Sequence, residues 1–163
     1  MTAAGGAAEA AGVLLEELRR DDLERVMAIE QASFERPWSR DSFLREFDLA
    51  FSRTLVARSA GVVVGYVCRW RLEDEIQILN VAVAPEMRRH GVGRALVEAV
   101  LREANDDRLD VSLEVAVGND AAVRLYQALG FAVAGARPDF YGRGRHARTM
   151  RRAGGGGCGR ESP

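Results

Sequence analysis

The sequence predicts one α/β domain built on a mixed sheet, and three observations lead to this fold class. The 163 residues, 47% apolar and 29% charged, suit a single globular domain, which at this length buries about 68–70% of its unfolded surface. Apolar spacing alternates between strand and helix periods in the order β-α-α-β-β-β-α-β-α-β-β. Short links predict antiparallel pairing of the central strands, and a later strand–helix–strand unit predicts a parallel or locally splayed pair.

The first half of the chain is expected to form one strand, two helices and three antiparallel strands. A strand over 13–18 precedes a helix that Asp21 or Asp22 caps and that Pro37 ends. Ser39 is expected to cap a second, short helix. The three strands are expected at 54–57, 62–72 and 76–83, with turns at 60–61 and 73–74.

The second half is expected to alternate loops, helices and strands. Gly130 directly follows the helix expected over 121–129 and is expected to end it, and apolar Phe131 comes next. The expected elements are a loop over 84–90, helices over 91–104 and 121–129, and strands over 111–117, 131–135 and 145–150.

The two ends are expected to be disordered, which leaves 13–152 as the folded domain. Residues 1–12 lack periodicity, and 153–163 are Gly-rich without an apolar anchor. Residues 1–12 also lack the basic and apolar blocks of a signal peptide, and no apolar run approaches the ~20 residues that span a bilayer. Since Cys68 and Cys158 are the only cysteines, a disulfide framework is excluded. We expect a cytoplasmic protein that binds no membrane.

Charge is distributed unevenly around a net charge of −1. Residues 1–136 hold 16 Arg and 22 acidic residues, whereas 137–163 hold 7 Arg and two acidic residues, and the chain has no Lys. Such a tail is either the footprint of a nucleic-acid or ribosome contact or a solvated Arg-rich segment. Because the domain itself is acidic, we expect no direct nucleic-acid binding. Neither His90 nor His146 belongs to a cluster with metal-ligand spacing, so we expect no metal.

A Gly-rich segment follows the strand over 76–83 and opens the next helix. Arg88–Ala95 reads Arg-Arg-His-Gly-Val-Gly-Arg-Ala. Glycine lets the backbone approach a ligand closely, and the first N–H groups of a helix, with its dipole, suit a pyrophosphate. The segment matches neither a P-loop nor a full dinucleotide motif, so a tight strand-to-helix turn is the alternative.

Two further segments carry candidate chemical groups. Glu114 stands in the middle of a strand, where its propensity is poor, and it fits either a general base or a solvated face. Asn119 is expected to cap the following helix and also to reach a ligand. Tyr126 lies one turn after Ala122, and its hydroxyl needs a partner if it is buried; a core tyrosine is the alternative.

Taken together, these motifs resemble the GNAT superfamily of N-acetyltransferases over about 14–150. The resemblance lies in Arg-x-x-Gly-x-Gly, the Glu-bearing strand, and Asn-x-x-Ala-x-x-Leu-Tyr-x-x-Leu-Gly-Phe at 119–131. The segments 34–39 (Phe-Glu-Arg-Pro-Trp-Ser), 74–83 and Phe140-Tyr141 are similar to the RimI-type ribosomal-protein-alanine N-acetyltransferases. The resemblance implies a mixed, mostly antiparallel sheet, flanked by helices and splayed at an acetyl-CoA site.

The resemblance also implies an activity and roles for individual residues. It implies transfer of an acetyl group from acetyl-CoA to the α-amine of a protein, such as the N-terminal alanine of a small-subunit ribosomal protein. Glu114 would be the proton acceptor and Tyr126 the proton donor. The implied cofactor-binding residues are Val81, Ala82, Val83, Arg89, His90, Gly91, Val92, Gly93, Arg94 and Asn119.

The substrate side leaves alternatives open. Trp38 and Tyr141 would shape the peptide entrance, although Trp38 also fits a core plug behind Pro37. Asp74 and Glu75 would draw in the substrate's ammonium, although they also fit a solvated hairpin tip.

The acceptor is open because the chain departs from the family in its last strand. Residues 144–150 read Gly-Arg-His-Ala-Arg-Thr-Met, where the family commonly has Gly-Glu-Asp-Ala and then apolar residues before Met. There are three alternatives to a protein α-amine as the acceptor. The acceptor is a small amine, it is a protein lysine, or there is none because the chain is a silent acetyl-CoA-binding module.

Overall fold

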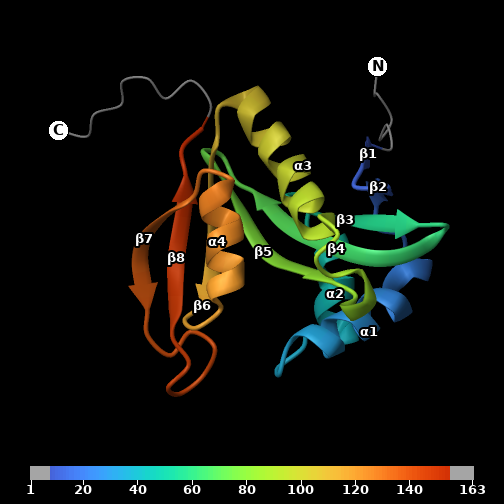
Figure 1. The fold of residues 1–163 in the computed structure, drawn as a ribbon, viewed down its shortest axis with the longest axis horizontal. Helices are drawn as coiled ribbons and strands as arrows, with labels where there is room; N and C mark the ends of the chain where they lie inside the picture. The colour runs from blue at the N-terminus through green and yellow to red at the C-terminus, as the bar shows by residue number, and fades with distance from the viewer. Residues whose placement is uncertain (1–7, 155–163) are drawn as a thin grey trace. The chain divides into compact units, whose positions relative to one another are not determined.

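The computed structural model describes residues 8–154, shown in Figure 1. These residues form two compact units, one from 8–70 and 80–99 and the other from 71–79 and 100–154. Strand β5 (Glu75–Val83) and helix α3 (Val92–Asp107) contribute to both units. The predicted order of strands and helices is confirmed, with one strand added at the start.

The first unit has the strand order β1-β2-β3-β4-β5. Strands β1 to β4 pair antiparallel, and the turn at 60–61 joins β3 to β4 as predicted. The remaining bounds are β1 (Ala8–Ala10), β2 (Val13–Glu17), β3 (Ser52–Ser59), β4 (Val62–Arg71), α1 (Leu23–Ser33), α2 (Arg40–Phe47) and the 3-10 turns Arg20–Asp22 and Pro85–Met87.

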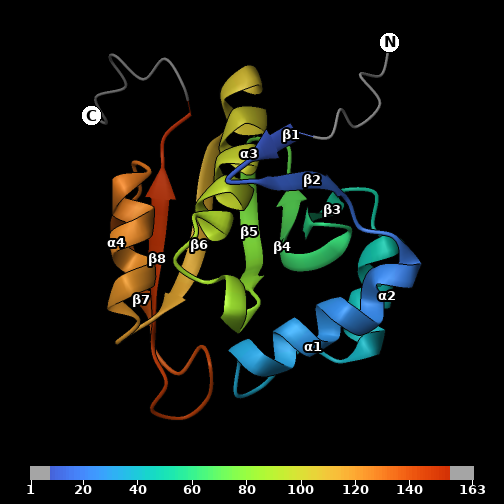
Figure 2. The same ribbon diagram turned by 45° about the vertical axis from the view of Figure 1, so that its right-hand side comes forward.

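Apolar side chains from α1, α2 and the strands form the core of this unit. Phe43 of α2 packs edge-on against Tyr66 of β4, and both side chains are buried. The same cluster includes Val26 and Ile29 of α1 and Ala82 near the end of β5. Helices α1 and α2 lie next to each other (Figure 2), and their apolar faces thereby cover the strands that lead to the end of β5.

The caps of these two helices differ in how well the sequence predicts them. Ser39 caps α2 as predicted, because its Oγ accepts a hydrogen bond from the Ser42 N–H at 3.1 Å. Asp22 occupies the N-cap position of α1 but makes no capping bond there. Its Oδ2 accepts instead from the Arg19 N–H at 2.9 Å and from the Arg58 guanidinium at 2.7 Å.

The second unit has the strand order β5-β6-β8-β7. The start of β5 pairs parallel with β6 from Glu75–Asp110 to Ile78–Leu113, as the strand–helix–strand pattern predicts. Strand β8 pairs antiparallel with β6 on one side and β7 on the other, and α4 lies across these strands (Figure 1). The bounds are β6 (Asp110–Ala116), α4 (Asp120–Ala128), β7 (Ala132–Arg137) and β8 (Ala147–Arg152).

Some boundaries differ from the expectation. Residues 8–10, expected to be disordered, pair as β1 with the predicted first strand; residues 1–7 and 155–163 lie outside the described residues. Strand β3 is longer than predicted, and β8 begins two residues later than predicted, at Ala147. Gly130 adopts φ +95° after α4, which confirms its predicted position. In residues 8–154 no helix is long and apolar enough to cross a membrane.

Candidate active site

The first group of candidate residues lies where β5 ends and α3 begins, in the first unit. Gly65 of β4 makes this arrangement possible. A Cβ there would lie 3.1 Å from the Ala82 carbonyl oxygen and 3.2 Å from the nearest side-chain carbons of Val92 and Leu96. Glycine thus lets β4 pack directly against the end of β5 and the first turns of α3, and this contact positions the backbone of Val81–Val83.

The loop between β5 and α3 is held mainly by Arg88. Its Nε donates to the Val83 carbonyl at 3.1 Å, and its Nη2 donates to Ser33 Oγ at 3.2 Å. The imidazole Nδ1 of His90 lies 2.8 Å from the Arg88 carbonyl oxygen. Arg88 therefore organises the loop, and it occupies the carbonyl of Val83, one of the three residues whose backbone the family resemblance implies for cofactor binding.

The start of α3 has the properties of an anion site. The N–H groups of its first turn have no carbonyl partner within the helix, and Arg89 and Arg94 beside them are exposed. Gly91 has φ +79°, which favours glycine. A Cβ at Gly93 would meet only Val83 Cγ2, at an ordinary 3.5 Å. Packing therefore does not require glycine at 93, and the missing side chain leaves room for the close approach of an anion such as a pyrophosphate.

The second group of candidate residues lies in the second unit, around Glu114. Strand β6 alternates buried and half-buried positions, and Glu114 belongs to the half-buried set. Thr149 of β8, its register partner, donates its hydroxyl to Glu114 Oε2 at 2.8 Å. Arg137 of β7 places Nη1 3.5 Å from Oε1. The carboxylate is therefore fixed in orientation by one oxygen, while the other faces a cation.

Two tyrosines accompany this carboxylate. The Tyr141 hydroxyl donates to the Glu114 carbonyl oxygen at 3.2 Å. Burial, together with the charge of Glu114, raises the pKa of Tyr141 to about 12. Burial, followed by the influence of Tyr141, raises the pKa of Tyr126 on α4 to about 12 as well. Tyr141 thus lies beside Glu114, whereas Tyr126 is buried and packs edge-on against Phe131, as a core tyrosine would. Both phenols keep their protons at neutral pH.

Asn119 has the capping role that the sequence predicts. Its Oδ1 accepts from the Ala122 N–H at 3.2 Å at the start of α4. The residue is exposed, so its side-chain amide is accessible to a ligand.

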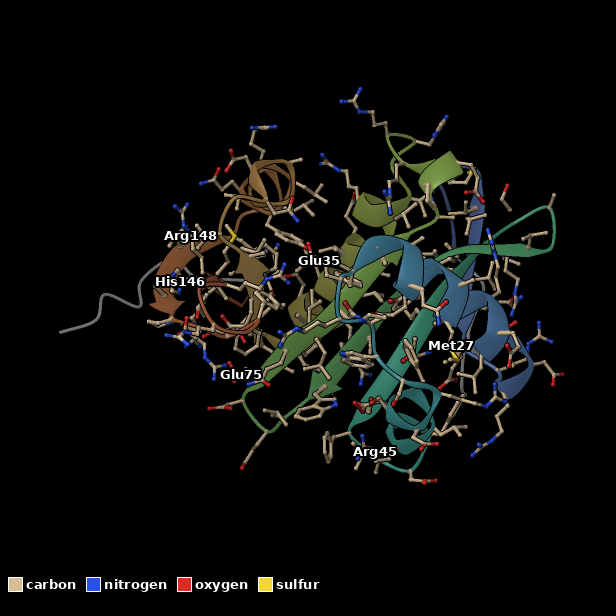
Figure 3. All side chains as sticks on the ribbon, turned by 90° about the horizontal axis from the view of Figure 1, so that it is seen from below. Met27, Glu35, Arg45, Glu75, His146 and Arg148 are labelled. Atoms are coloured by element: carbon tan, nitrogen blue, oxygen red, sulfur yellow. The ribbon has the colours of Figure 1, made fainter. Side chains whose placement is uncertain are left out.

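The acidic pair at the start of β5 is not brought to Glu114. Glu75, labelled in Figure 3, accepts a hydrogen bond from Gln77 at 2.8 Å and lies 3.6 Å from Arg151. Since Glu75 is level with Asp110, Glu114 lies four residues, or ~13 Å, further along. Asp74 is exposed before the strand. Asp74 is thus placed as in a solvated hairpin tip and Glu75 takes part in an ion pair, while the attraction of the substrate's ammonium by these two residues stays a prediction.

Trp38 is partly a core residue and partly a surface residue. It packs against the core of the first unit, with its ring 5.2 Å from that of Phe43. Its other side lines a groove of about 460 Å³. Arg45 of α2, labelled in Figure 3, and Trp70 of β4 line the same groove.

A buried polar cluster in the first unit was not foreseen. The Glu30 carboxylate, 1% exposed, accepts the Tyr66 hydroxyl at 2.5 Å and the Asn80 amide at 3.1 Å. The Trp38 N–H lies 3.4 Å from its Oε2. Burial raises the pKa of Glu30, although its hydrogen bonds oppose this shift. The sequence signal for this cluster was the presence of Glu30 and Asn80 at positions that fit an apolar pattern. The cluster holds Asn80, the residue before Val81.

Each of the two units contributes groups of a kind that an acyl-transferring enzyme uses. A helix start suited to a pyrophosphate and a half-buried carboxylate accompanied by protonated phenols are the parts such an enzyme needs. The chain belongs to the acetyltransferase (GNAT) family, whose model matches residues 23–131. This match confirms the predicted family and identifies the chain as an N-acetyltransferase of that family.

Several similar proteins carry the names of RimI-type N-terminal acetyltransferases. The N-alpha-acetyltransferase RimI of Mycobacterium tuberculosis is 35% identical over 142 residues, which cover 83% of this chain and 89% of that protein. The [ribosomal protein bS18]-alanine N-acetyltransferase of Escherichia coli K12 is 34% identical over 128 residues, 76% of this chain and 84% of that protein. The crystal structure of the E. coli ribosomal-protein-S18-alanine N-acetyltransferase superposes with a TM-score of 0.78 at 29% identity, covering 85% and 92% of the two chains. The predicted fold class is thereby confirmed.

Proposed function

We propose that this chain transfers an acetyl group from acetyl-CoA to the α-amine of a protein, with the N-terminal alanine of a small-subunit ribosomal protein as the first candidate. The GNAT family uses acetyl-CoA, and relatives at 34–35% identity carry the names of N-terminal acetyltransferases. The observation that carries the proposal is Glu114, whose Oε2 is fixed by Thr149 at 2.8 Å while Oε1 already faces a cation, the Arg137 guanidinium at 3.5 Å.

The binding of acetyl-CoA is assigned to the first turn of α3 and its flanking residues. The N–H groups of Val92, Gly93 and Arg94 would hold the pyrophosphate, with Arg89 and His90 beside them. The backbone of Val81–Val83 would bind the thioester arm, and Asn119 would contact the cofactor. When bound, acetyl-CoA supplies an acyl group that is activated toward an amine.

Glu114 is assigned the role of general base. An α-amine with a pKa of about 7.7–8.0 is mostly protonated at neutral pH and cannot attack. Glu114 removes this proton, directly or through a water. The nitrogen would then form a bond to the acetyl carbon as the carbon–sulfur bond breaks, and it would lose its second proton to solvent to become the amide. No covalent bond to the enzyme is needed. A β5 N–H near Val81 would stabilise the charge on the thioester oxygen.

Tyr126 is assigned to the departing sulfur. Its pKa of about 12 exceeds that of an ordinary thiol, about 8.5, by ~3.5 units. Full proton transfer to a free thiolate is therefore uphill. Tyr126 would act first as a hydrogen-bond donor that stabilises the developing thiolate, and the thiol is completed by a proton from solvent.

Free-thiol release from acetyl-CoA tests this function with three peptides. One has a free N-terminal Ala, one is the same peptide with a blocked N-terminus, and one is blocked and carries an internal Lys. We expect release with the first peptide alone. Release with the Lys peptide would move the reaction to side-chain amines. Cofactor binding without any release would favour a silent binding module. We assign the reaction to the cytoplasm, in keeping with the buried free thiol of Cys68.

A further inference from the structure

We infer that Arg137 makes this enzyme selective for protein N-termini whose second or third residue is acidic. The inference rests on the proposed function, because it concerns the peptide that places its α-ammonium at Glu114. In the structure a cation already lies where the substrate's α-ammonium would bind, because the Arg137 guanidinium is 3.5 Å from Glu114 Oε1.

Strand register places Arg137 and Glu114 on the same face of the second unit. Glu114 pairs with Thr149 and Ala116 with Ala147, while Arg137 pairs with the same Ala147 across β8. Neighbouring residues directly opposite in a sheet point to the same face, and the ion pair between Arg137 and Glu114 agrees with this. A peptide α-amine that reaches Glu114 must therefore pass or displace the Arg137 guanidinium.

The ammonium and the guanidinium compete for one carboxylate oxygen. Thr149 occupies Oε2 with a 2.8 Å hydrogen bond, so Oε1 is the oxygen left for a cation. Arg137 keeps its charge at any ordinary pH, and it cannot yield the site by losing a proton. It must instead exchange Glu114 for another anion.

Arg137 is held close by after such an exchange. Its guanidinium lies 4.5 Å above the Phe140 ring, a cation–π contact that leaves its edge free to donate. An extended peptide advances ~3.3 Å per residue. A guanidinium within 3.5 Å of Glu114 is thus within reach of the second or third side chain of a peptide whose first nitrogen is at Glu114. A carboxylate there accepts two parallel hydrogen bonds from it.

The surrounding charges favour the same peptide. Asp139 is the only acidic residue in 132–152, and its Oδ1 already accepts the Gly144 N–H at 2.7 Å within its own loop. Arg143 of that loop is exposed. A basic second residue would meet these cations without a compensating acid, whereas an acidic residue replaces the anion that Arg137 gives up.

The experiment compares three peptides that differ only in their second residue, Ala-Asp, Ala-Gln and Ala-Arg, by kcat/KM from thiol release at low and high salt. We expect the order Asp, Gln, Arg, with about twofold to thirtyfold between the first and last, because the favourable pair with Asp and the unfavourable pair with Arg each contribute ~0.2–1 kcal/mol. We expect salt to reduce this difference. Arg137→Gln should abolish this order and lower KM for Ala-Gln, because no cation has to be displaced.

Arg148→Gln is the matched control. Arg148 pairs with Val115 and Ala136, which places it on the opposite face from Glu114, on the α4 side in Figure 3. It removes the same charge, and we expect it to keep the wild-type order. Melting curves of both variants check folding. Equal rates with all three peptides, a preference for Ala-Arg, or an order unchanged in Arg137→Gln would overturn the inference while leaving N-terminal acetylation intact. Absence of turnover with every free N-terminus would overturn both.

Discussion

The buried Glu30 cluster makes a quantitative prediction about stability. In Glu30→Ala, the Tyr66 hydroxyl and the Asn80 amide lose the acceptor that now lies 2.5 and 3.1 Å away. Each unsatisfied buried donor costs about 1–3 kcal/mol, and truncation adds a cavity. We expect a loss of about 3–5 kcal/mol, which for a chain of this size lowers Tm by about 6–20 °C. Glu30→Gln keeps one acceptor and should lose about 1 kcal/mol.

The pH dependence follows from the direction of the pKa shift. The folded Glu30 has a pKa above its ordinary value of 4.5, so the folded protein keeps this proton to a higher pH than the unfolded chain does. Its contribution to stability is therefore greatest below pH 4.5 and falls as pH rises through the folded-state pKa. Glu30→Gln has no proton to lose at this position. The difference in free energy of unfolding between wild type and Glu30→Gln should therefore become smaller as pH rises.

Urea unfolding from pH 4 to 8 and thermal melts measure both effects. Glu24→Ala is the control, because Glu24 lies on the same helix with its side chain 82% exposed, and we expect it to cost less than about 0.5 kcal/mol. If Glu30→Ala lost no more than Glu24→Ala, the cluster would have no structural role. If Glu30→Gln lost as much as Glu30→Ala at every pH, the charge itself, rather than an acceptor, would be required.

Three predictions concern the site. Gly93→Ala should raise the acetyl-CoA Kd about tenfold and leave Tm unchanged or higher, since its Cβ meets protein only at 3.5 Å and Ala favours helix; a calorimetric titration with unchanged Kd would contradict the pyrophosphate assignment. Glu114→Gln should lower kcat by about 10²–10⁴-fold with acetyl-CoA affinity retained, and loss of that affinity would contradict the role of base. Tyr126→Phe should lower kcat about 10²-fold in steady-state assays, whereas an unaltered kcat would make Tyr126 a packing residue.

Local signals explain why most of the fold could be predicted. Ser39 caps a helix by its own side chain, and Gly130 ends one by its positive φ, so each acts within a few residues of its position in the sequence. The parallel pairing of β5 with β6 follows from the intervening helix. Strand β1 was missed because its three residues have no apolar alternation and depend on pairing with β2.

The candidate site was predictable in its residue types but not in its contacts. Glu114 stands out in a strand, but its partners Thr149 and Arg137 depend on the register of β8, which the loop 138–146 sets. Turn patterns do not fix the register across a loop of this length. Arg88 belongs to the Gly-rich segment but was given no role of its own, and only the fold shows that it holds the Val83 carbonyl.

Locating the transferred acetyl group tests the central claim most directly. A peptide with both a free N-terminal Ala and an internal Lys would be incubated with the enzyme and acetyl-CoA, and fragment masses would assign the modified nitrogen. We predict acetylation at the α-nitrogen alone, and none with Glu114→Gln at the same enzyme concentration and time. Acetylation at the Lys side chain with the α-amine unmodified would contradict N-terminal acetylation.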